Sequence, residues 1–371
     1  MNKNIAIILG DGIGPEVTQQ SIKVLDAIAE KFEHQFNYTY SLMGVVAIDK
    51  TGNPLPDETI ATCLNSDAIL FGTIGDPKYD NDPTSKVRPE QGLLRLRKTL
   101  QLFANIRPVT TYRSLHHLAP VKSTLLEDVD MLIFRELTGG IYFGDKHMNE
   151  DNTLASDECT YSKEEIERIS KLAFQYAQKR RKKLTLVDKA NVLETSRLWR
   201  KVVQDIAPSY PDVQVDFMYI DNAVMQLIIN PKQFDVLLAD NMFGDILSDE
   251  ASVLSGSIGL LPSASIGNGS AMFEPVHGSY PQAAGKDIAN PLGSILSVAL
   301  MLDYFSMKEE AQVLRDAVDW TLTHLFVTKD IDPINFYFTS TIGDLISDYI
   351  SGRISGDINK KNVELRKSTI I

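Results

Sequence analysis

The sequence has only two cysteines, Cys63 and Cys159, and no long uncharged hydrophobic run. It contains no CxxC pair and no cluster of His and Cys, so the spacing supports neither a disulfide framework nor a structural zinc site, and two reduced thiols are the simplest interpretation. A membrane-spanning helix needs about 18 apolar residues in a row, and the apolar run at residues 5–9 is too short for a signal peptide. We therefore expect a cytoplasmic protein, or the mature form of an organellar one.

Positive charge is also scarce, because 37 lysines and arginines stand against 49 aspartates and glutamates, a net charge of −12. Such a surface repels phosphate backbones and anionic lipids, which argues against nucleic acid and membranes as partners. An anionic small molecule must then meet a locally basic pocket. The basic run at residues 179–183 is interpreted as the solvated end of a helix, where cations complement the helix dipole.

What the chain does have is enough apolar sequence for a large core. At about 150 residues per domain, its 371 residues, 43% of them hydrophobic, allow about two domains. Strand-length apolar runs alternate with amphipathic helical patterns, which predicts an α/β protein. The predicted strands lie at 5–9, 68–71, 131–134, 184–187, 215–220 and 236–239, and the predicted helices at 15–32, 163–181, 194–206 and 293–304. The polar tail from residue 351 is expected to be marginally ordered or docked at the surface.

A glycine cluster, Gly10, Gly12 and Gly14, follows the first predicted strand. Its spacing is G-x-G-x-G, whereas the dinucleotide fingerprint G-x-G-x-x-G needs its third glycine one place later, so an ordinary Rossmann fold is rejected. A tight turn and a backbone that approaches a ligand both remain open.

Residues 90–103 read as a helix with two stripes. Leu96, Leu100 and Phe103 form the expected core stripe, and an adjoining stripe mixes a carboxylate, two leucines and a guanidinium: Glu90, Leu93, Leu94 and Arg97. The mixture suits a pocket that binds an anion beside an apolar group, although a snorkelling arginine would also explain it. Arg107 and Arg135, in strand-like contexts, could join Arg97 to hold two carboxylates through bidentate contacts.

Asp245 and Asp249 are four residues apart and so share one helix face near its N-terminus. The two charges repel each other unless a cation lies between them, and ligand sets made only of oxygen select Mg²⁺ or Mn²⁺. Asp221, after the predicted strand at 215–220, could supply a third carboxylate, with N-capping as the alternative.

Lys189 follows an apolar strand, where partial desolvation could make it a general base. Tyr142, in a glycine-flanked stretch that reads like a hairpin, could carry a proton, with a core tyrosine as the alternative.

Together these segments closely resemble the β-decarboxylating dehydrogenase family, which includes the isocitrate and isopropylmalate dehydrogenases. The resemblance covers essentially the whole chain. Its most specific blocks are residues 90–97 with 105–108, 135–144, 187–193, 240–249 and 277–291.

The resemblance implies two open α/β domains that share a mixed sheet, which we place at residues 1–102 with 256–371 and at 103–255. It also implies an obligate homodimer with shared active sites. Arg97, Arg107 and Arg135 would hold the carboxylates of a malate-type substrate, and Asp245 and Asp249 would hold Mg²⁺ or Mn²⁺ with Asp221 of the partner subunit. The implied contacts to NAD, which this family binds without a Rossmann fold, are Glu90, Gly75, His277, Gly278, Ser279, Gln282, Ala284, Gly285 and Asn290.

The reaction implied is oxidative decarboxylation of 3-isopropylmalate to 4-methyl-2-oxopentanoate and CO₂, with reduction of NAD, in leucine biosynthesis. Lys189 of the partner subunit would accept the hydroxyl proton, with Asp221 in the same catalytic group, and Tyr142 would protonate C3. Leu93, Leu94 and Val192 would line an apolar pocket for the isopropyl group.

Gln282 departs from the family pattern, because NAD users usually carry an aspartate there that bonds the ribose hydroxyls and repels a 2′-phosphate. NAD stays the expected cofactor, with weaker discrimination against NADP. Other functions considered are metal-dependent phosphoryl transfer, oxidation of a related malate such as tartrate or homoisocitrate, and non-catalytic binding. The sequence lacks the lysine spacing of a P-loop, and phosphoryl transfer explains the three arginines and Lys189 no better than a dehydrogenase does.

Overall fold

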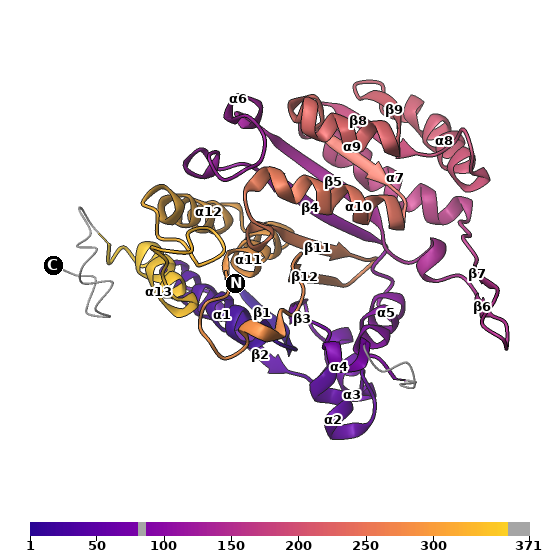
Figure 1. The fold of residues 1–371 in the computed structure, drawn as a ribbon. Coiled ribbons are helices and arrows are strands. Elements are labelled where there is room, and N and C mark those ends of the chain that lie inside the picture. The colour runs from indigo at the N-terminus through magenta and orange to yellow at the C-terminus, as the bar shows by residue number, and fades with distance from the viewer. Residues whose placement is uncertain (81–86, 355–371) are drawn as a thin grey trace.

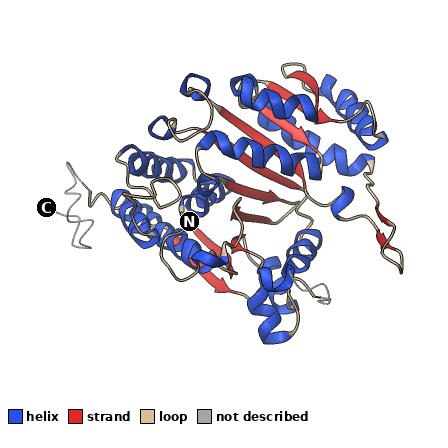
Figure 2. Cartoon of the chain, viewed as in Figure 1, coloured by secondary structure: helices blue, strands red, loops and turns tan. Residues whose placement is uncertain are grey.

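The computed structural model describes residues 1–80 and 87–354 and places them around one ten-stranded sheet (Figures 1 and 2). The strands of this sheet are β1 (Asn2–Gly10), β2 (Gln35–Tyr40), β3 (Ala68–Thr73), β4 (Ala104–Thr110), β5 (Asp130–Glu136), β8 (Lys183–Asp188), β9 (Gln214–Tyr219), β10 (Val236–Ala239), β11 (Pro262–Ile266) and β12 (Ala271–Pro275). Strands β6 (Lys146–Met148) and β7 (Ala155–Asp157) form a separate antiparallel hairpin.

The helices that the structure describes lie on both faces of the sheet and at one end of it (Figure 2). They are α1 (Gly14–Phe32), α2 (Val45–Thr51), α3 (Asp57–Leu64), α4 (Pro77–Asp80), α5 (Pro89–Thr99), α6 (Ser123–Leu126), α7 (Lys163–Gln178), α8 (Glu194–Ile206), α9 (Ile220–Ile229), α10 (Asn241–Ser252), α11 (Leu292–Tyr304), α12 (Lys308–Thr323) and α13 (Thr339–Ile350). None of these described helices combines the length and hydropathy needed to cross a membrane.

The strand order is β2-β1-β3-β12-β11-β4-β5-β10-β8-β9. The outer pairs are parallel, whereas β12–β11, β11–β4 and β4–β5 are antiparallel, so the sheet is mixed. This confirms the predicted α/β class and differs from the doubly wound dinucleotide-binding order. The late strands β11 and β12 lie between β3 and β4, so two strands that follow each other in the sequence are separated in the sheet by a segment that follows residue 255.

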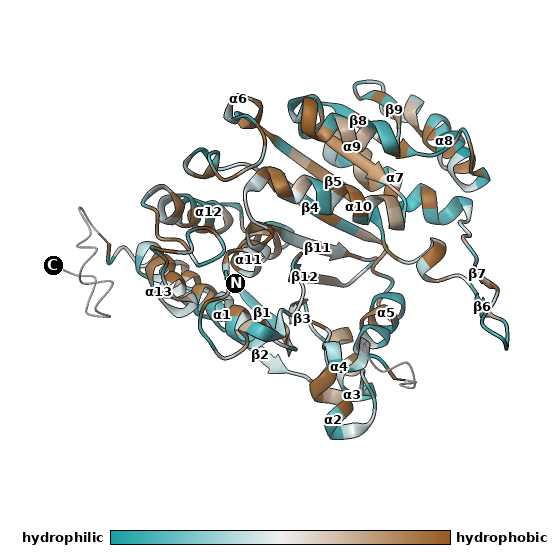
Figure 3. Ribbon diagram, viewed as in Figure 1, coloured by the Kyte–Doolittle hydropathy of each residue, from teal (hydrophilic) through white to brown (hydrophobic). Residues whose placement is uncertain are grey.

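Helices cover both faces of the sheet beyond β4. Leu132 and Phe134 of β5 pack with α7 and α8, whereas Met131 and Ile133 of the same strand pack with α9 and α10. This alternation follows from the two-residue period of a strand, and burial on both faces explains the near-continuous apolar runs of β8 and β10. Figure 3 shows hydrophobic residues along β5 and its neighbours and hydrophilic residues on α8 and on the β6–β7 hairpin.

The predicted strands and helices are confirmed, with corrections at their ends. Helix α5 ends at Thr99, and Gln101 has a positive φ of 51°, so the chain turns and Phe103 packs with α7 and α8 rather than on the α5 face. Helix α7 ends at Gln178, before the basic run. Arg180 and Arg181 are not simply solvated, because they form ion pairs with Asp130 and Asp235. Residues 355–371 of the predicted tail lie outside the described residues.

Candidate active site

Two of the predicted arginines leave adjacent antiparallel strands on the same face of the sheet. Arg107 belongs to β4 and Arg135 to β5, and Arg135 pairs in register with Asn105. Arg107 Nε donates to Asn105 Oδ1 at 2.7 Å, and Arg135 Nε donates to Asn241 Oδ1 at 3.0 Å. Both arginines are buried. Because Ile133 on the same face packs against α10, the guanidinium groups also point toward that helix.

Helix α10 supplies the carboxylates that meet these arginines. Arg107 Nη1 lies 3.4 Å from Asp245 Oδ1 and 3.5 Å from Asp249 Oδ1, and Arg135 forms an ion pair with Asp245. The close approach depends on Gly244, where a Cβ atom would come within 2.7 Å of Arg135 Cβ. The prediction that Asp245 and Asp249 share one helix face is confirmed, since both carboxylates lie against Arg107. Burial raises the pKa of Asp249, although the neighbouring Arg107 acts in the opposite direction.

Arg97, from α5, reaches the same region and binds Glu274 of β12, with 2.9 Å between Nη2 and Oε1. Burial, together with the nearby Arg107 and Arg97 guanidinium groups, lowers the pKa of Arg135 to about 10. Burial also lowers the pKa of Arg107, and Arg97 adds to this effect. The three cations are therefore close enough to destabilise one another, and an anion with two carboxylates would relieve their repulsion.

Tyr142 lies in a 3₁₀ turn, Gly140–Tyr142, and not in a hairpin as predicted, because the β6–β7 hairpin begins four residues later. Its hydroxyl donates to Asp245 Oδ2 at 3.1 Å, and its ring centroid is 5.5 Å from the Arg135 guanidinium carbon. Burial and the Asp245 carboxylate raise the pKa of Tyr142, so its hydroxyl keeps its proton at neutral pH. The alternative of a core tyrosine is wrong, since the side chain is 37% exposed.

Lys189 and Asp221 form a second polar group, separate from the arginines. Lys189 follows β8, and its ammonium pairs with Asp221, which lowers the pKa of that carboxyl group. Asp221 lies in the first turn of α9, with Tyr219 at the N-cap, so it is neither a strand end nor an N-cap. Within the described part of one chain, no group of three His, Cys, Asp or Glu side chains could hold a metal ion. One chain thus brings Asp245 and Asp249 together without Asp221.

The three residues predicted to line an apolar pocket differ in their surroundings. Leu93 is 9% exposed and packs into a core cluster with Leu96, whereas Leu94 is half-buried. Val192 is 60% exposed and belongs to none of the hydrophobic clusters that the described residues form. The described chain by itself therefore leaves Val192 outside any apolar pocket.

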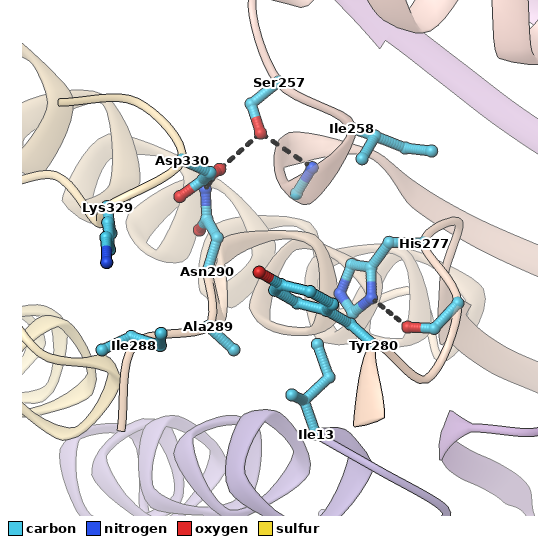
Figure 4. Close-up of a pocket in the computed structure, with 12 residues that line it drawn as sticks. Ile13, Ser257, Ile258, His277, Tyr280, Ile288, Ala289, Asn290, Lys329 and Asp330 are labelled. Atoms are coloured by element: carbon cyan, nitrogen blue, oxygen red, sulfur yellow. Dashed lines mark hydrogen bonds between the residues drawn. The ribbon is translucent and has the colours of Figure 1, made fainter. Parts of the chain in front are cut away.

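The predicted cofactor loop borders a cavity of about 550 Å³ (Figure 4). His277, Gly278 and Asn290 line it, whereas Ser279, Gln282, Ala284 and Gly285 lie in the same loop without lining the cavity. Lining residues that the sequence reading missed are Ile13, Ser257, Ile258, Gly259, Tyr280, Ile288, Ala289, Lys329 and Asp330. Ile13, Tyr280, Ile288 and Ala289 lie inside or beside the motifs already noted, whereas no local pattern marks Lys329 and Asp330.

The glycine cluster is explained mainly by close packing of the backbone. A Cβ atom at Gly10 would lie 1.9 Å from the carbonyl oxygen of Thr73, and one at Gly12 would lie 2.0 Å from that of Ser279. The Ile13 amide donates to the same Ser279 oxygen at 2.8 Å. The first βα turn therefore holds the loop at 277–285 in place, and the tight-turn interpretation is confirmed.

Two observations test whether a dinucleotide fits. His277 Nε2 is buried and has no hydrogen-bond partner among the described residues, and burial lowers the pKa of His277, so the ring is neutral and can bond a heterocycle. At the other end, a Cβ atom on Gly75 would come within 2.7 Å of Glu90 Oε1, so the predicted neighbours Gly75 and Glu90 do meet. The chemistry of His277 and the proximity of Gly75 and Glu90 are compatible with a bound dinucleotide, and their role stays a prediction.

The chain resembles known dehydrogenases along nearly its whole length. Residues 4–346 match the family model described as isocitrate/isopropylmalate dehydrogenase. A 3-isopropylmalate dehydrogenase of Bacteroides fragilis is 54% identical, covering 94% of this chain and 99% of that one. The solved isocitrate dehydrogenase of Methylococcus capsulatus is 33% identical, with a TM-score of 0.86 and coverage of 94% and 99%. A β-decarboxylating dehydrogenase of Thermococcus kodakarensis, solved in its apo form, is 34% identical, with a TM-score of 0.77 and coverage of 96% and 99%.

Proposed function

The chain belongs to the isocitrate/isopropylmalate dehydrogenase family, and from this premise we propose that it oxidises and decarboxylates 3-isopropylmalate to 4-methyl-2-oxopentanoate and CO₂, with NAD as the oxidant, in leucine biosynthesis. The observation that carries the proposal is the convergence of Arg97, Arg107 and Arg135 beside Asp245 and Asp249. A protein with a net charge of −12 has concentrated buried cations where a dicarboxylate can bind. We place this reaction in the cytoplasm.

In this proposal the arginines orient the substrate. Arg107 and Arg135 are anchored by Asn105 and Asn241, which leaves Nη atoms of both guanidinium groups directed at the region of Asp245. Planar guanidinium groups held in this way bind carboxylates through paired hydrogen bonds, which fixes the direction of the neighbouring C2 and C3 atoms. Leu93 and Leu94 stand on α5, the helix that carries Arg97, and would meet the isopropyl group.

The carboxylates of Asp245 and Asp249 fit a hard divalent cation because both supply oxygen ligands. Both pair with Arg107, and a bound dicarboxylate would replace them as its partner and leave them free to bind the cation. We propose that they hold Mg²⁺ or Mn²⁺ together with Asp221 of the partner subunit. When bound, the metal would act as a Lewis acid and NAD would accept a hydride. The residues implied for NAD are those of the cofactor loop with Gly75 and Glu90.

Proton movements fall to Lys189 and Tyr142. Lys189 of the partner subunit takes the proton of the C2 hydroxyl as C2 is oxidised. Tyr142 donates its hydroxyl proton to C3 after CO₂ has left, and its raised pKa keeps that proton available at neutral pH. Because Tyr142 already donates to Asp245, its hydroxyl is held at the edge of the arginine cluster.

A homodimer completes this site. Large hydrophobic side chains are exposed on the β6–β7 hairpin segment and on α9 and α10, namely Met148, Leu154, Met225, Ile229 and Ile246, each at least 48% exposed. Met225, Ile229 and Ile246 lie on α9 and α10, the helices that carry Asp221 and Asp245, and we propose that a second copy covers them. The same contact would bring Lys189 and Asp221 of the partner subunit to the arginines. The proposed domains, 1–102 with 256–371 and 103–255, would then each supply one side of the site.

The proposal is tested by following NADH absorbance with 3-isopropylmalate and NAD, with and without EDTA. We expect NADH and CO₂ in equal amounts and loss of both on chelation, with recovery on adding Mg²⁺ or Mn²⁺. Isocitrate, tartrate and homoisocitrate serve as alternative substrates in the same assay. Turnover of one of these in preference to 3-isopropylmalate would replace the substrate proposed here, and no NADH with any of them would overturn the dehydrogenase function.

A further inference from the structure

Tyr280 stands out in the cofactor loop because of its backbone. Its φ of 37° and ψ of 62° place a bulky side chain in the left-handed region, which L-residues other than Asn and Asp rarely occupy. The neighbouring bonds hold it there, since the Ile13 amide donates to the carbonyl oxygen of Ser279 at 2.8 Å and the Ala283 amide to that of Tyr280 at 3.0 Å. Asp287 in the same loop also has a positive φ, of 56°, but among the described non-glycine residues with a positive φ it is Tyr280 that lines the cavity.

The side chain of Tyr280 is not used by the protein itself. It is 57% exposed, and its hydroxyl and ring make no hydrogen bond or ring contact with the described residues. Figure 4 shows the ring projecting from its loop into the space bordered by Ile13, Ala289 and His277. The backbone conformation directs an exposed aromatic ring into a cavity, where it can contact a ligand.

The rest of the cavity identifies the kind of ligand. Ile13, Ile258, Ile288 and Ala289 supply aliphatic surface, so the space between them and the Tyr280 ring suits a flat heteroaromatic ring. The unpartnered Nε2 of His277 offers that ring a hydrogen bond. Resting on the proposed use of NAD, we propose that Tyr280 stacks on the adenine of the cofactor and determines the affinity for its adenosine half.

The test measures binding of fragments by calorimetry in the full chain, without turnover. AMP and ADP-ribose probe the adenosine half, and nicotinamide mononucleotide probes the other half. We expect Tyr280→Gly to weaken AMP and ADP-ribose roughly ten-fold, as loss of a base–aromatic stack does, and to leave the mononucleotide unchanged. Tyr280→Phe should keep wild-type affinity, because the ring and not the hydroxyl makes the stack.

Two controls separate stacking from structure. Glycine relieves the left-handed conformation, so Tyr280→Gly should melt no lower than wild type while losing AMP. Tyr40→Ala removes a tyrosine of similar exposure, 56%, on β2 and should leave AMP affinity unchanged. If wild type binds AMP and Tyr280→Gly binds it equally well, the stacking role is overturned while the dehydrogenase proposal stands. If wild type binds neither AMP nor NAD and forms no NADH, the proposed function fails as well.

Discussion

At the scale of single residues, the site depends on charges kept in unfavourable surroundings. Arg135 and Arg107 are buried beside each other, and their pKa values are lowered by burial and by neighbouring guanidinium groups. Asp245 and Asp249 partly compensate these two cations, and Glu274 pairs with the nearby Arg97. A dicarboxylate that replaced the aspartates on the arginines would free those aspartates for a cation, so substrate and metal are expected to bind cooperatively.

The substrate pocket gives a prediction at Leu93. We expect Leu93→Ser to lower kcat/KM for 3-isopropylmalate about ten-fold, because a polar side chain removes apolar contact with the isopropyl group. Leu93 is 9% exposed, so thermal unfolding must be measured alongside steady-state kinetics to separate folding from binding. Leu93→Met keeps the volume and apolar character and should retain most activity. An unchanged kcat/KM in a folded Leu93→Ser variant would exclude Leu93 from the pocket.

The choice between cofactors gives a second prediction at Gln282. A neutral amide neither binds the ribose hydroxyls as a carboxylate would nor repels a 2′-phosphate, so we expect wild type to prefer NAD only modestly. Gln282→Asp should raise the ratio of kcat/KM for NAD to that for NADP, mainly by lowering the NADP value. The ratio staying constant in this variant would show that the residue does not face the ribose.

At the scale of elements, helix α10 carries the two carboxylates that meet the arginines, and its N-cap is a buried carboxyl group. Asp240 is its N-cap and accepts a hydrogen bond from the Phe243 amide at 2.8 Å. Burial is the main reason that the pKa of Asp240 rises from 3.8 to about 6. The strand β10 before it is fully buried, so the cap cannot move toward solvent. The helix therefore starts at a carboxyl group that is destabilised in its charged form.

The sign of this shift predicts how stability depends on pH. The folded state holds the Asp240 proton more tightly than the unfolded chain, so this residue lowers the free energy of unfolding as pH rises from about 4 to about 6. We expect Asp240→Asn, which keeps a capping oxygen, to be more stable than wild type at pH 7 by up to about 3 kcal/mol. The difference should vanish near pH 4.

Urea unfolding at pH 4, 5.5 and 7, at one protein concentration, measures this difference. Asp240→Ala serves as the matched control, because it removes both the charge and the cap and should be less stable than Asp240→Asn by about 1 kcal/mol. A difference between wild type and Asp240→Asn that stays the same at all three pH values would contradict the raised pKa.

At the scale of the whole molecule, the residues proposed for the site form two groups that one chain does not bring together. The arginines, Asp245 and Tyr142 form one group, and Lys189 with Asp221 forms another. Exposed hydrophobic side chains on α9 and α10 lie on the elements that carry Asp221 and Asp245. Pairing of two copies through these helices is the proposed way to unite the two groups.

Mixed dimers test this division. Lys189→Ala and Asp245→Asn homodimers should each be inactive, because every site lacks one essential group. After the two are unfolded together and refolded, half of the dimers should be mixed, and one of the two sites in each mixed dimer should be intact, giving about a quarter of wild-type activity. The same amounts refolded separately and then combined are the control. Failure of the mixture to regain activity would place both residues in a site within one chain.

The sequence by itself determined the features that depend on local spacing. Buried strands such as β8 and β10 and amphipathic helices such as α7 and α8 follow from periodicity, and Asp245 and Asp249 share a face because they are four residues apart. The three arginines were found from their local contexts. The sequence does not reveal that Arg97 pairs with Glu274, because the two residues are 177 positions apart and such a contact leaves no local pattern.

Only the tertiary structure decided which distant segments meet. Inserting β11 and β12 between β3 and β4 brings Glu274 to Arg97, and the return of the chain brings Lys329 and Asp330 to the cavity beside His277. Gln101 has a positive φ that ends the helical path, so Phe103 packs with α7 and α8 and not on the predicted helix face. Tyr280 also has a positive φ, and its aromatic ring lines the cavity. These outcomes depend on packing between elements far apart in the chain, whose energies exceed the local preferences that a sequence pattern records.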